Sequence, residues 1–336
     1  MRDVAAQAGV SATVVSRVLS GKGRGVRVSE ATAQRVRVAA EEMGYRLNVT
    51  ARQFRERQTM MIGVLHGIGF GRPHLHGSSQ YFAALMDGII DGAFEFGYSV
   101  TLCPKLLGQT PEDAMADGRF DGLVWYSTTP SSENSRMLER CTVPLVFIHT
   151  PSDGLMGRFP TVRCDNDQGI GLAVEHLVEL GHRRIAFVVT RDDIFGELEP
   201  RRSAFVRHLR RHGISVSHRD VISVEADRMA RPFELLQRYT AAVAVNDGAA
   251  SLILDHAERT GIRIPERLSV VGFDSTHFCL GLRPRLTSVH QPLAVMGRQA
   301  VTLLVKRIAG DPLCPTDIVL PCGLDIRDST MSIAST

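Results

Sequence analysis

The sequence lacks any run of about 18 apolar residues, the minimum for a membrane-spanning helix, so we expect no membrane-embedded segment. Met1 is followed by Arg2 and Asp3 rather than by an apolar stretch, so we also expect no export signal. Its six cysteines form no C-x-x-C pair and have no histidine at metal-ligand spacing, which argues against disulfides and structural zinc. These absences predict a cytoplasmic chain without membrane contact, metal or cofactor.

Motifs of common enzyme classes are absent as well. The sequence contains no G-x-S-x-G elbow, no H-E-x-x-H pair and no Walker loop. The stretch GIGFG misses the dinucleotide-binding fingerprint by one residue. Three nearby histidines, His66, His74 and His76, lack i, i+4 spacing and have no acidic or cysteine partner beside them, which disfavours a metal site. The sequence therefore gives little support to a catalytic function.

Charge is distributed unevenly along the chain. Residues 1–60 hold 11 Lys and Arg against 5 Asp and Glu, a net charge of +6, whereas residues 61–336 hold 28 against 31, a net charge of −3. With 336 residues the chain is long enough for two or three domains. A small basic domain attached to a mildly acidic body predicts that the small domain binds a polyanion. A basic surface that only contacts solvent is the alternative.

Three short helices are predicted in the first 50 residues. The first ends at Gly9, a residue that tolerates the left-handed backbone of a tight turn. The second begins after a cap at Ser11, and the third runs from a cap at Ser29 to Gly44. Two helices joined by a turn and braced by a third form a helix-turn-helix pattern.

The second helix has two distinct faces. Val15, Val18 and Leu19 form an apolar face, and the opposite face carries Thr13, Ser16, Arg17 and Ser20. In a helix-turn-helix this second helix enters the major groove, where short hydroxyl side chains allow close approach and an arginine can contact guanine or a phosphate. A polar stripe that only contacts solvent is the alternative. The predicted DNA-contacting residues of this domain are Ser11, Ala12, Thr13, Ser16 and Arg17.

Three segments carry a family resemblance. In their order and spacing, these segments resemble the LacI/GalR family of bacterial transcription regulators. They are DVAAQAGVSATVVSRVLSG, VSEATAQRVRVAAEEMGY and NVTARQFR. The resemblance implies that the third segment is a hinge helix, which binds the minor groove as a dimer pair and wedges an apolar side chain between base pairs. The matching positions are Asn48, Ala51, Arg52 and Phe54. Phe54 stands where the family usually has leucine, and packing of Phe54 on the neighbouring domain is the alternative role.

After Met60 the pattern alternates between strands and helices. Buried strands are predicted at MIGVLHGI, YSVTLC, FDGLVWYS, VPLVFIH, RRIAFVV, AAVAVN and LSVVGFD. Helices between them would cover both faces of parallel sheets, so the body is an α/β structure. The number of strands favours two doubly wound parallel-sheet subdomains over one.

Polar residues follow several of these strands. Ligands of doubly wound sheets bind beyond the carboxyl ends of strands, and two such sheets leave a cleft between them. The candidates are His149, Asn246, Asp247 and Asp274. We expect Asp247 to act as a helix cap, because an aspartate that leads into a helix usually does. The other three are candidate ligand-binding residues.

The body also resembles the LacI/GalR family, through DNDQGIGLAVEHLVELGHRRIAFV, GIRIPERLSVVGFDS, RPRLTSVHQPLAVMGRQAVTLL and LDIRDST. This resemblance implies the fold of periplasmic sugar-binding proteins, with an effector cleft between the subdomains. The implied effector-binding residues are Tyr81, Phe82, His149, Arg201, Asn246 and Asp274, with Tyr81 and Phe82 as an apolar wall. Two positions depart from the family: His149 replaces a frequent acid, and Glu199 replaces an arginine of some members. The identity of the effector is therefore not transferable.

The resemblance also implies domain boundaries. It places a helix-turn-helix domain at 1–47, a hinge helix with linker at 48–59, and an effector-binding and dimerisation domain at 60–336. The two subdomains of the last would comprise about 60–161 with 291–318, and about 162–290 with 319–330.

The resulting prediction is a DNA-binding transcriptional repressor controlled by a small effector, a sugar or sugar derivative. It would act on a pseudo-palindromic operator as a homodimer, with a dimer of dimers as a further assembly. Two functional alternatives are a solute-binding protein and an α/β enzyme with an appended basic domain. The missing export signal and the basic helix-turn-helix disfavour the former, and the missing catalytic motifs disfavour the latter. Either induction or co-repression by the effector fits the sequence.

Overall fold

The computed structural model describes residues 1–20, 28–46, 58–66, 79–102, 117–126, 138, 141–150, 158–190, 197–225, 228–313 and 315–333. The chain forms two compact units, Met1–Thr59 and Met60–Thr336. The predicted hinge positions Asn48, Ala51, Arg52 and Phe54 lie outside the described residues, as do His74 and His76. Within the described ranges, no helix has both the length and the apolar character needed to cross a membrane.

The first unit contains the three predicted helices: α1 (Arg2–Ala8), α2 (Ala12–Ser20) and α3 (Glu30–Glu42). Gly9 ends α1 with a φ of 64°, a left-handed value that glycine adopts at little cost. The Ser29 side chain caps α3 by accepting a hydrogen bond from the backbone N–H of Thr32. Val15 and Val36 are completely buried in the core that the three helices share. The predicted all-α N-terminal domain is therefore confirmed.

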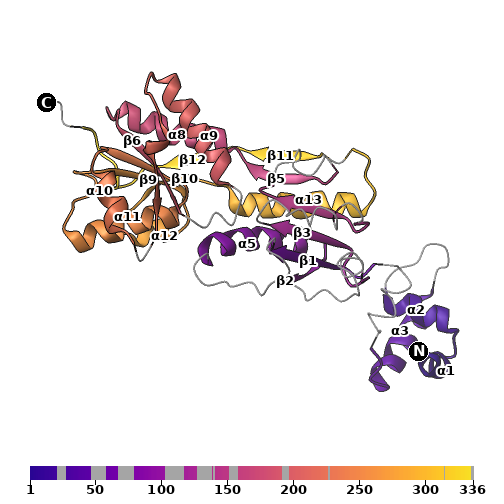
Figure 1. The fold of residues 1–336 in the computed structure, drawn as a ribbon. Helices are drawn as coiled ribbons and strands as arrows, with labels where there is room; N and C mark the ends of the chain where they lie inside the picture. The colour runs from indigo at the N-terminus through magenta and orange to yellow at the C-terminus, as the bar shows by residue number, and fades with distance from the viewer. Residues whose placement is uncertain are drawn as a thin grey trace. The chain divides into compact units, whose positions relative to one another are not determined.

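The second unit contains two six-stranded sheets (Figure 1). The strand order of the first is β11-β5-β4-β3-β1-β2, and its strands pair in parallel. Its strands are β1 (Met61–His66), β2 (Ser99–Leu102), β3 (Gly122–Tyr126), β4 (Leu145–Ile148), β5 (Thr161–Cys164) and β11 (Asp317–Leu320).

The second sheet has the order β12-β10-β9-β8-β6-β7. It is parallel except at one edge, where β12 runs antiparallel to β10. Its strands are β6 (Ile185–Thr190), β7 (Val221–Val224), β8 (Ala241–Ala244), β9 (Ser269–Asp274), β10 (Thr287–His290) and β12 (Gly323–Asp325). The α/β class with two doubly wound subdomains is confirmed, with this one antiparallel edge strand as a refinement.

Helices cover the sheets. Figure 1 shows α5 (Ser79–Glu95) and α13 (Leu293–Ile308) beside the first sheet. The second subdomain contains α8 (Asn166–Glu179), α9 (Leu198–Arg211), α10 (Ala230–Leu236), α11 (Asp247–Thr260), α12 (Phe278–Gly281) and the short 3-10 helix η2 (His218–Asp220). The helices α5 and α13 cross closely because glycines lie at their contact: a Cβ built on Gly297 would lie 2.3 Å from the carbonyl oxygen of Leu85.

The chain passes between the two subdomains three times. The crossings follow β5, β10 and β11, so they lie near residues 165, 291 and 321. The first sheet therefore extends a few residues beyond the boundaries expected near 161 and 318, because β5 ends at Cys164 and β11 at Leu320. The carboxyl ends of β4 and β9 lead into His149 and Asp274, two of the candidate site residues.

Candidate functional site

The polar face of α2 is accessible to a partner. Thr13 is exposed, and Ser16 and Arg17 are half-buried, whereas Val15 on the opposite face is completely buried. Ser11 lies at the start of the helix, where its hydroxyl accepts a hydrogen bond of 3.4 Å from the backbone N–H of Val14. This arrangement leaves hydroxyl groups and a guanidinium on one side of a short helix, in a unit with excess positive charge.

Ala12 contributes no polar group to that surface. Ala12 packs against the core of the three helices. The side chain of Ser20 lies outside the described set. The roles of Ser11, Ala12, Thr13, Ser16 and Arg17 in binding DNA remain predictions.

A second group of polar residues lies between the two sheets of the Met60–Thr336 unit. The first subdomain contributes Tyr81 from α5 and His149 from the end of β4, and Tyr81 Oη hydrogen-bonds to His149 Nε2. The second subdomain contributes Glu197, which precedes α9, and its Oε1 lies 3.5 Å from His149 Nδ1. A chain of polar contacts therefore crosses the cleft between the subdomains.

Arg201 is the centre of this polar network. It is only 3% exposed, and its guanidinium stacks on the ring of Phe273 at 3.8 Å from the centroid. Its Nη1 donates to the carbonyl of Val245 at 2.6 Å, and its Nε donates to Asn166 Oδ1 at 2.9 Å. Arg201 also lies 3.6 Å from a Glu197 carboxylate oxygen.

The charge of Arg201 is retained despite this burial. Burial lowers the pKa of the guanidinium, but the carboxylates of Glu197 and Asp274 more than offset that effect, so its pKa is raised overall. The Asp274 Oδ1 atom lies 3.8 Å from Arg201 Nη1. Because its hydrogen-bonding and ionic partners are already within the protein, Arg201 is poorly placed to bind an additional anion.

Asp274 ends β9 at the mouth of the cleft and accepts a hydrogen bond of 2.6 Å from Gln291 Nε2. Burial, followed by the nearby charge of Asp247, holds the pKa of Asp274 well above its usual range. Gln291 Oε1 is buried and has no hydrogen-bond partner among the residues that the structure describes. A buried amide oxygen without a donor is costly, so it marks a position where a ligand hydroxyl would be stabilised.

His149 is neutral in this environment. Burial, followed by the charge of Arg201, lowers the pKa of its imidazole to about 3. Its 3.5 Å contact with Glu197 is therefore not an ion pair at neutral pH. The pKa of the Tyr81 hydroxyl is raised, mainly by burial, so this group stays protonated. Because His149 Nδ1 faces the Glu197 carboxylate, the tautomer with the proton on Nδ1 is favoured, and in that tautomer Nε2 accepts the hydrogen bond from Tyr81.

Two predicted site residues have strained backbones. His149 has a φ of 77° and Asp274 a φ of 122°, in the region that favours glycine. Such conformations cost about 1 to 3 kcal/mol each and are concentrated at functional sites. His149 directly follows β4 and Asp274 ends β9, and both turn their side chains into the cleft, which supports a role in ligand binding.

The remaining predicted positions have structural partners of their own. Phe82 is only 6% exposed and packs in the core, with its ring 5.1 Å from that of Tyr126. Asn246 caps α11, and its Oδ1 accepts a hydrogen bond of 2.8 Å from the backbone N–H of Ala249. Contact of Phe82 or Asn246 with an effector remains a prediction.

The expected capping role of Asp247 is wrong, since Asn246 caps α11 and Asp247 is its first residue. Asp247 is buried and accepts hydrogen bonds from Ser288 Oγ at 2.5 Å and from Cys279 Sγ at 3.0 Å. It therefore joins β10 and α12 to α11 beneath the cleft. Glu199, the departure noted from the family, lies on the surface and pairs with Arg202 at 2.8 Å.

Sequence reasoning missed three members of the network: Asn166, Glu197 and Gln291. Asn166 and Gln291 follow the short strands β5 and β10, which the hydrophobic pattern did not reveal. Glu197 precedes Arg201 by one helical turn, and this i, i+4 spacing of opposite charges was the available signal.

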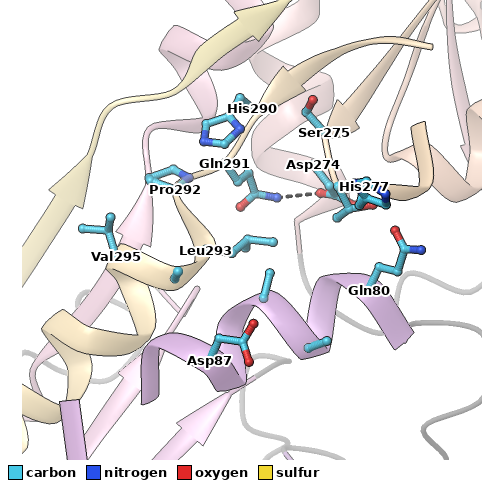
Figure 2. Close-up of a pocket in the computed structure, with 14 residues that line it drawn as sticks. Gln80, Asp87, Asp274, Ser275, His277, His290, Gln291, Pro292, Leu293 and Val295 are labelled. Atoms are coloured by element: carbon cyan, nitrogen blue, oxygen red, sulfur yellow. Dashed lines mark hydrogen bonds between the residues drawn. The ribbon is translucent and has the colours of Figure 1, made fainter. Parts of the chain in front are cut away.

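A pocket of about 450 Å³ opens beside the network. Figure 2 shows it between α5, the residues after β9 and the start of α13, with Asp274 and Gln291 hydrogen-bonded at its edge. Its volume is within the range of small-molecule sites. Further polar residues that line it are Gln80, Asp87, Ser275, His277 and His290.

Comparison with known families gives two matches. Residues 1–48 match the family described as bacterial regulatory proteins, lacI family. Residues 174–330 match the periplasmic binding protein-like domain. The two matches therefore fall on the helical unit and on the part of the body that contains Arg201, Asn246 and Asp274.

Individual proteins are similar over nearly the whole chain. The HTH-type transcriptional regulator MalR of Streptomyces coelicolor is 30% identical, over 99% of this chain and 96% of its own. A lac repressor dimer bound to operator and the anti-inducer ONPF is 26% identical with a TM-score of 0.77, over 98% of both chains. The transcriptional regulator CelR in complex with cellobiose is 27% identical with a TM-score of 0.70, over 97% of this chain and 98% of its own.

Proposed function

Because the chain belongs to the LacI family of bacterial regulatory proteins, we propose that it is a transcriptional repressor whose affinity for operator DNA is set by a small molecule. The observation that carries this proposal is the buried network of Tyr81, His149, Arg201 and Asp274, which joins the two subdomains at the cleft. A ligand that replaced some of these contacts would change how the subdomains are held together, and this is a physical basis for a switch.

The DNA-binding half of the proposal rests on the first unit. Its second helix would lie in the major groove, where Thr13 and Ser16 allow close approach and Arg17 contacts a guanine edge or a phosphate. Ser11 and Ala12 would lie at the amino-terminal end of that helix, against the phosphate backbone. The hinge residues Asn48, Ala51, Arg52 and Phe54 would fold in the minor groove, with Phe54 as the wedge.

The effector half rests on the chemistry of the cleft. Carboxylates and amides dominate it, and its arginine is already paired with Glu197 and Asp274. Such a site favours an uncharged ligand rich in hydroxyl groups, which can donate to Asp274 and to the unpaired Oε1 of Gln291. We therefore assign the effector to the neutral sugars, with Tyr81, Phe82, His149, Arg201, Asn246 and Asp274 as the residues around it.

The assembly that we propose is a homodimer, as in the lac repressor dimer to which the chain is similar. Its surface offers a face for a second copy: Phe94 on α5 is 86% exposed, Ile90 is 51% exposed and Leu102 at the end of β2 is 45% exposed. Large exposed apolar side chains on adjacent elements are typical of subunit interfaces. A twofold dimer would bind a pseudo-palindromic operator, and two dimers could pair further.

The other functional alternatives are weaker. Similar proteins are named transcriptional regulators or repressors, which favours a regulator over an enzyme or a solute-binding protein. A DNA-binding regulator acts where the chromosome is, so we place the protein in the cytoplasm.

The proposal is tested by selecting binding sites from random duplex DNA with the full-length protein. We expect a pseudo-palindromic sequence that binds roughly 1,000-fold more tightly than random DNA, with an affinity that falls steeply with salt. A thermal-shift screen of neutral sugars should then find a ligand that also changes operator affinity. Failure to enrich any sequence would contradict the DNA-binding half, and a sugar that stabilises the protein without changing operator affinity would contradict the switch.

A further inference from the structure

One surface of the body has a charge that the proposed function does not use. Residues 200–219 contain six arginines and three histidines but no aspartate or glutamate. Glu199 and Asp220 flank the segment and accept hydrogen bonds from Ser203 and Ser217. This is unusual within residues 61–336, where acidic residues outnumber Lys and Arg by 31 to 28. The segment includes most of α9 and the connection to β7.

The helix α9 separates its arginines onto two sides. Arg201 is buried in the cleft, whereas Arg202, Arg207, Arg210 and Arg211 are exposed. These four line a cavity of about 770 Å³ together with residues of the connection between α9 and β7. We call this cavity the basic groove; its other lining residues are Ser203, Val206, Val216, Ser217, His218 and Val221.

The basic groove combines a charged rim with an apolar floor. The three lining valines, Val206, Val216 and Val221, are half-buried, whereas the four arginines are exposed. Arg202 is held by Glu199 at 2.8 Å and Arg207 by Asp167 at 2.5 Å. No carboxylate of the described residues forms an ion pair with Arg210 or Arg211.

Helix stability alone does not explain this arrangement. Basic residues in the last turn of a helix interact favourably with its dipole, by about 0.3 to 1 kcal/mol each, which accounts for Arg210 and Arg211 individually. Arg202 and Arg207 are accounted for by their ion pairs with Glu199 and Asp167, so the unexplained feature is that Arg210 and Arg211 lie at the same groove as these two pairs. Arg210 and Arg211 have no carboxylate partner among the described residues, and a bound anion would relieve the repulsion between their charges.

We propose that the basic groove binds a small organic molecule that carries two or more phosphate groups. Guanidinium groups bind phosphate oxygens through paired hydrogen bonds. Among the groove arginines, Arg210 and Arg211 are the two for which the described residues supply no carboxylate partner. The valine floor would contact the organic part of the molecule. The volume of about 770 Å³ is within the range of ligand sites.

The shape of the surface favours a small molecule over duplex DNA. Duplex DNA binds protein surfaces that contact its backbone at many phosphates. The basic groove is an open depression, and its four arginines all belong to the single helix α9. Duplex binding at this surface is therefore a separate hypothesis, which the experiment below distinguishes.

The test compares two double variants of the full-length protein with equal change of charge. Arg210→Ala with Arg211→Ala removes the two groove arginines without a carboxylate partner. Arg259→Ala with Arg263→Ala removes two exposed arginines outside the groove and serves as the control. Adenosine triphosphate and inorganic tripolyphosphate are titrated by calorimetry at 0.15 M salt, and hydrogen–deuterium exchange locates the bound site.

Adenosine triphosphate should slow exchange in residues 202–221, and its affinity should fall about 30-fold or more in the groove variant and less than about 3-fold in the control. Tripolyphosphate should bind the same site more weakly, because it lacks a part that contacts the valines. An equal loss of affinity for adenosine triphosphate in both variants would show that only the net charge of the protein matters, and this would overturn the proposal. Protection of 202–221 by random duplex DNA but by neither phosphate compound would overturn it in favour of DNA.

Discussion

The Nδ1 atom of His149 lies 3.5 Å from the Oε1 atom of Glu197, across the boundary between the two subdomains. His149 follows β4 of the first sheet, and Glu197 precedes α9 of the second subdomain. Burial, followed by the charge of Arg201, lowers the pKa of the imidazole to about 3. At neutral pH the Glu197 carboxylate therefore faces an uncharged imidazole ring. Protonation of His149 would therefore change a contact between the two subdomains.

This linkage predicts a loss of stability at mildly acidic pH. The folded pKa of His149 lies below the ordinary value of about 6.5, so the unfolded chain binds the proton more tightly. The destabilisation is therefore absent well above pH 6.5 and grows as the pH falls toward 3. At pH 5.5 it should reach about 1.4 kcal/mol of the free energy of unfolding, measured by urea denaturation at pH 7.5 and 5.5.

The control is His149→Gln, which keeps a polar side chain but does not titrate. Other groups, including Asp274 with its raised pKa, contribute equally to the parent and the variant, so the difference between the two isolates His149. The parent should lose about 1.4 kcal/mol more than the variant between the two pH values. Parallel pH dependences would show that His149 is not held neutral.

Much of this architecture could be predicted from the sequence, and the reason is visible in individual elements. The strands β1, β3, β6 and β9 are apolar on both faces, which makes them easy to recognise. The strands β5, β7, β10, β11 and β12 have only three or four residues and contain polar side chains, so the hydrophobic pattern did not reveal them. Their positions are fixed by pairing with neighbours that are distant in sequence.

The site shows the same division. His149 and Asp274 could be predicted because they follow recognisable strands, and Arg201 came from a family resemblance. Glu197 and Gln291 could not, because their roles depend on which crossings of the chain meet at the cleft. The role of Asp247 could not be predicted from neighbouring residues alone. Asn246 caps α11 in its place, and Asp247 is instead buried and accepts a hydrogen bond from Ser288, which is distant in sequence.

The crossing of α5 and α13 gives a prediction about stability. A methyl group on Gly297 would lie 2.3 Å from the Leu85 carbonyl oxygen and 2.8 Å from the Ile89 nitrogen, both backbone atoms that cannot rotate away. We expect Gly297→Ala to lower the free energy of unfolding by about 1 to 3 kcal/mol or more, despite the higher helix propensity of alanine. Urea denaturation followed by circular dichroism measures this change.

Gly281→Ala provides the matched control. Gly281 also lies in a helix, and an added Cβ there would meet no atom within 4 Å. Its replacement should change the free energy of unfolding by less than about 0.5 kcal/mol. If both alanine variants were equally stable, the close crossing would not be a constraint.

Arg17 gives a prediction about the specificity of DNA binding. Arg17→Ala should reduce the preference for the selected operator over random DNA by about 1 to 3 kcal/mol, because a bidentate contact to guanine is worth that much. The fold of the first unit should persist, because Arg17 lies away from the buried Val15. We therefore expect the circular dichroism spectrum of the variant to match that of the parent. Fluorescence anisotropy with both duplexes measures the change, and equal weakening on each would assign Arg17 to a phosphate instead.

The last prediction separates the two sites by a cross-comparison. Asp274→Ala removes the acceptor at the cleft and should weaken the sugar found in the thermal-shift screen by about 1 to 3 kcal/mol, while operator affinity in the absence of sugar stays within about 2-fold. Arg17→Ala should do the reverse, because residues 17 and 274 belong to separate compact units and communicate only through a conformational equilibrium. Asp255→Ala, which removes an exposed aspartate outside the cleft, controls for the lost charge.

Calorimetry of sugar binding and anisotropy of operator binding are measured on all three variants. Unchanged sugar affinity in Asp274→Ala would remove that residue from the effector site, and weaker sugar binding by DNA-free Arg17→Ala would show that the two sites are not separable.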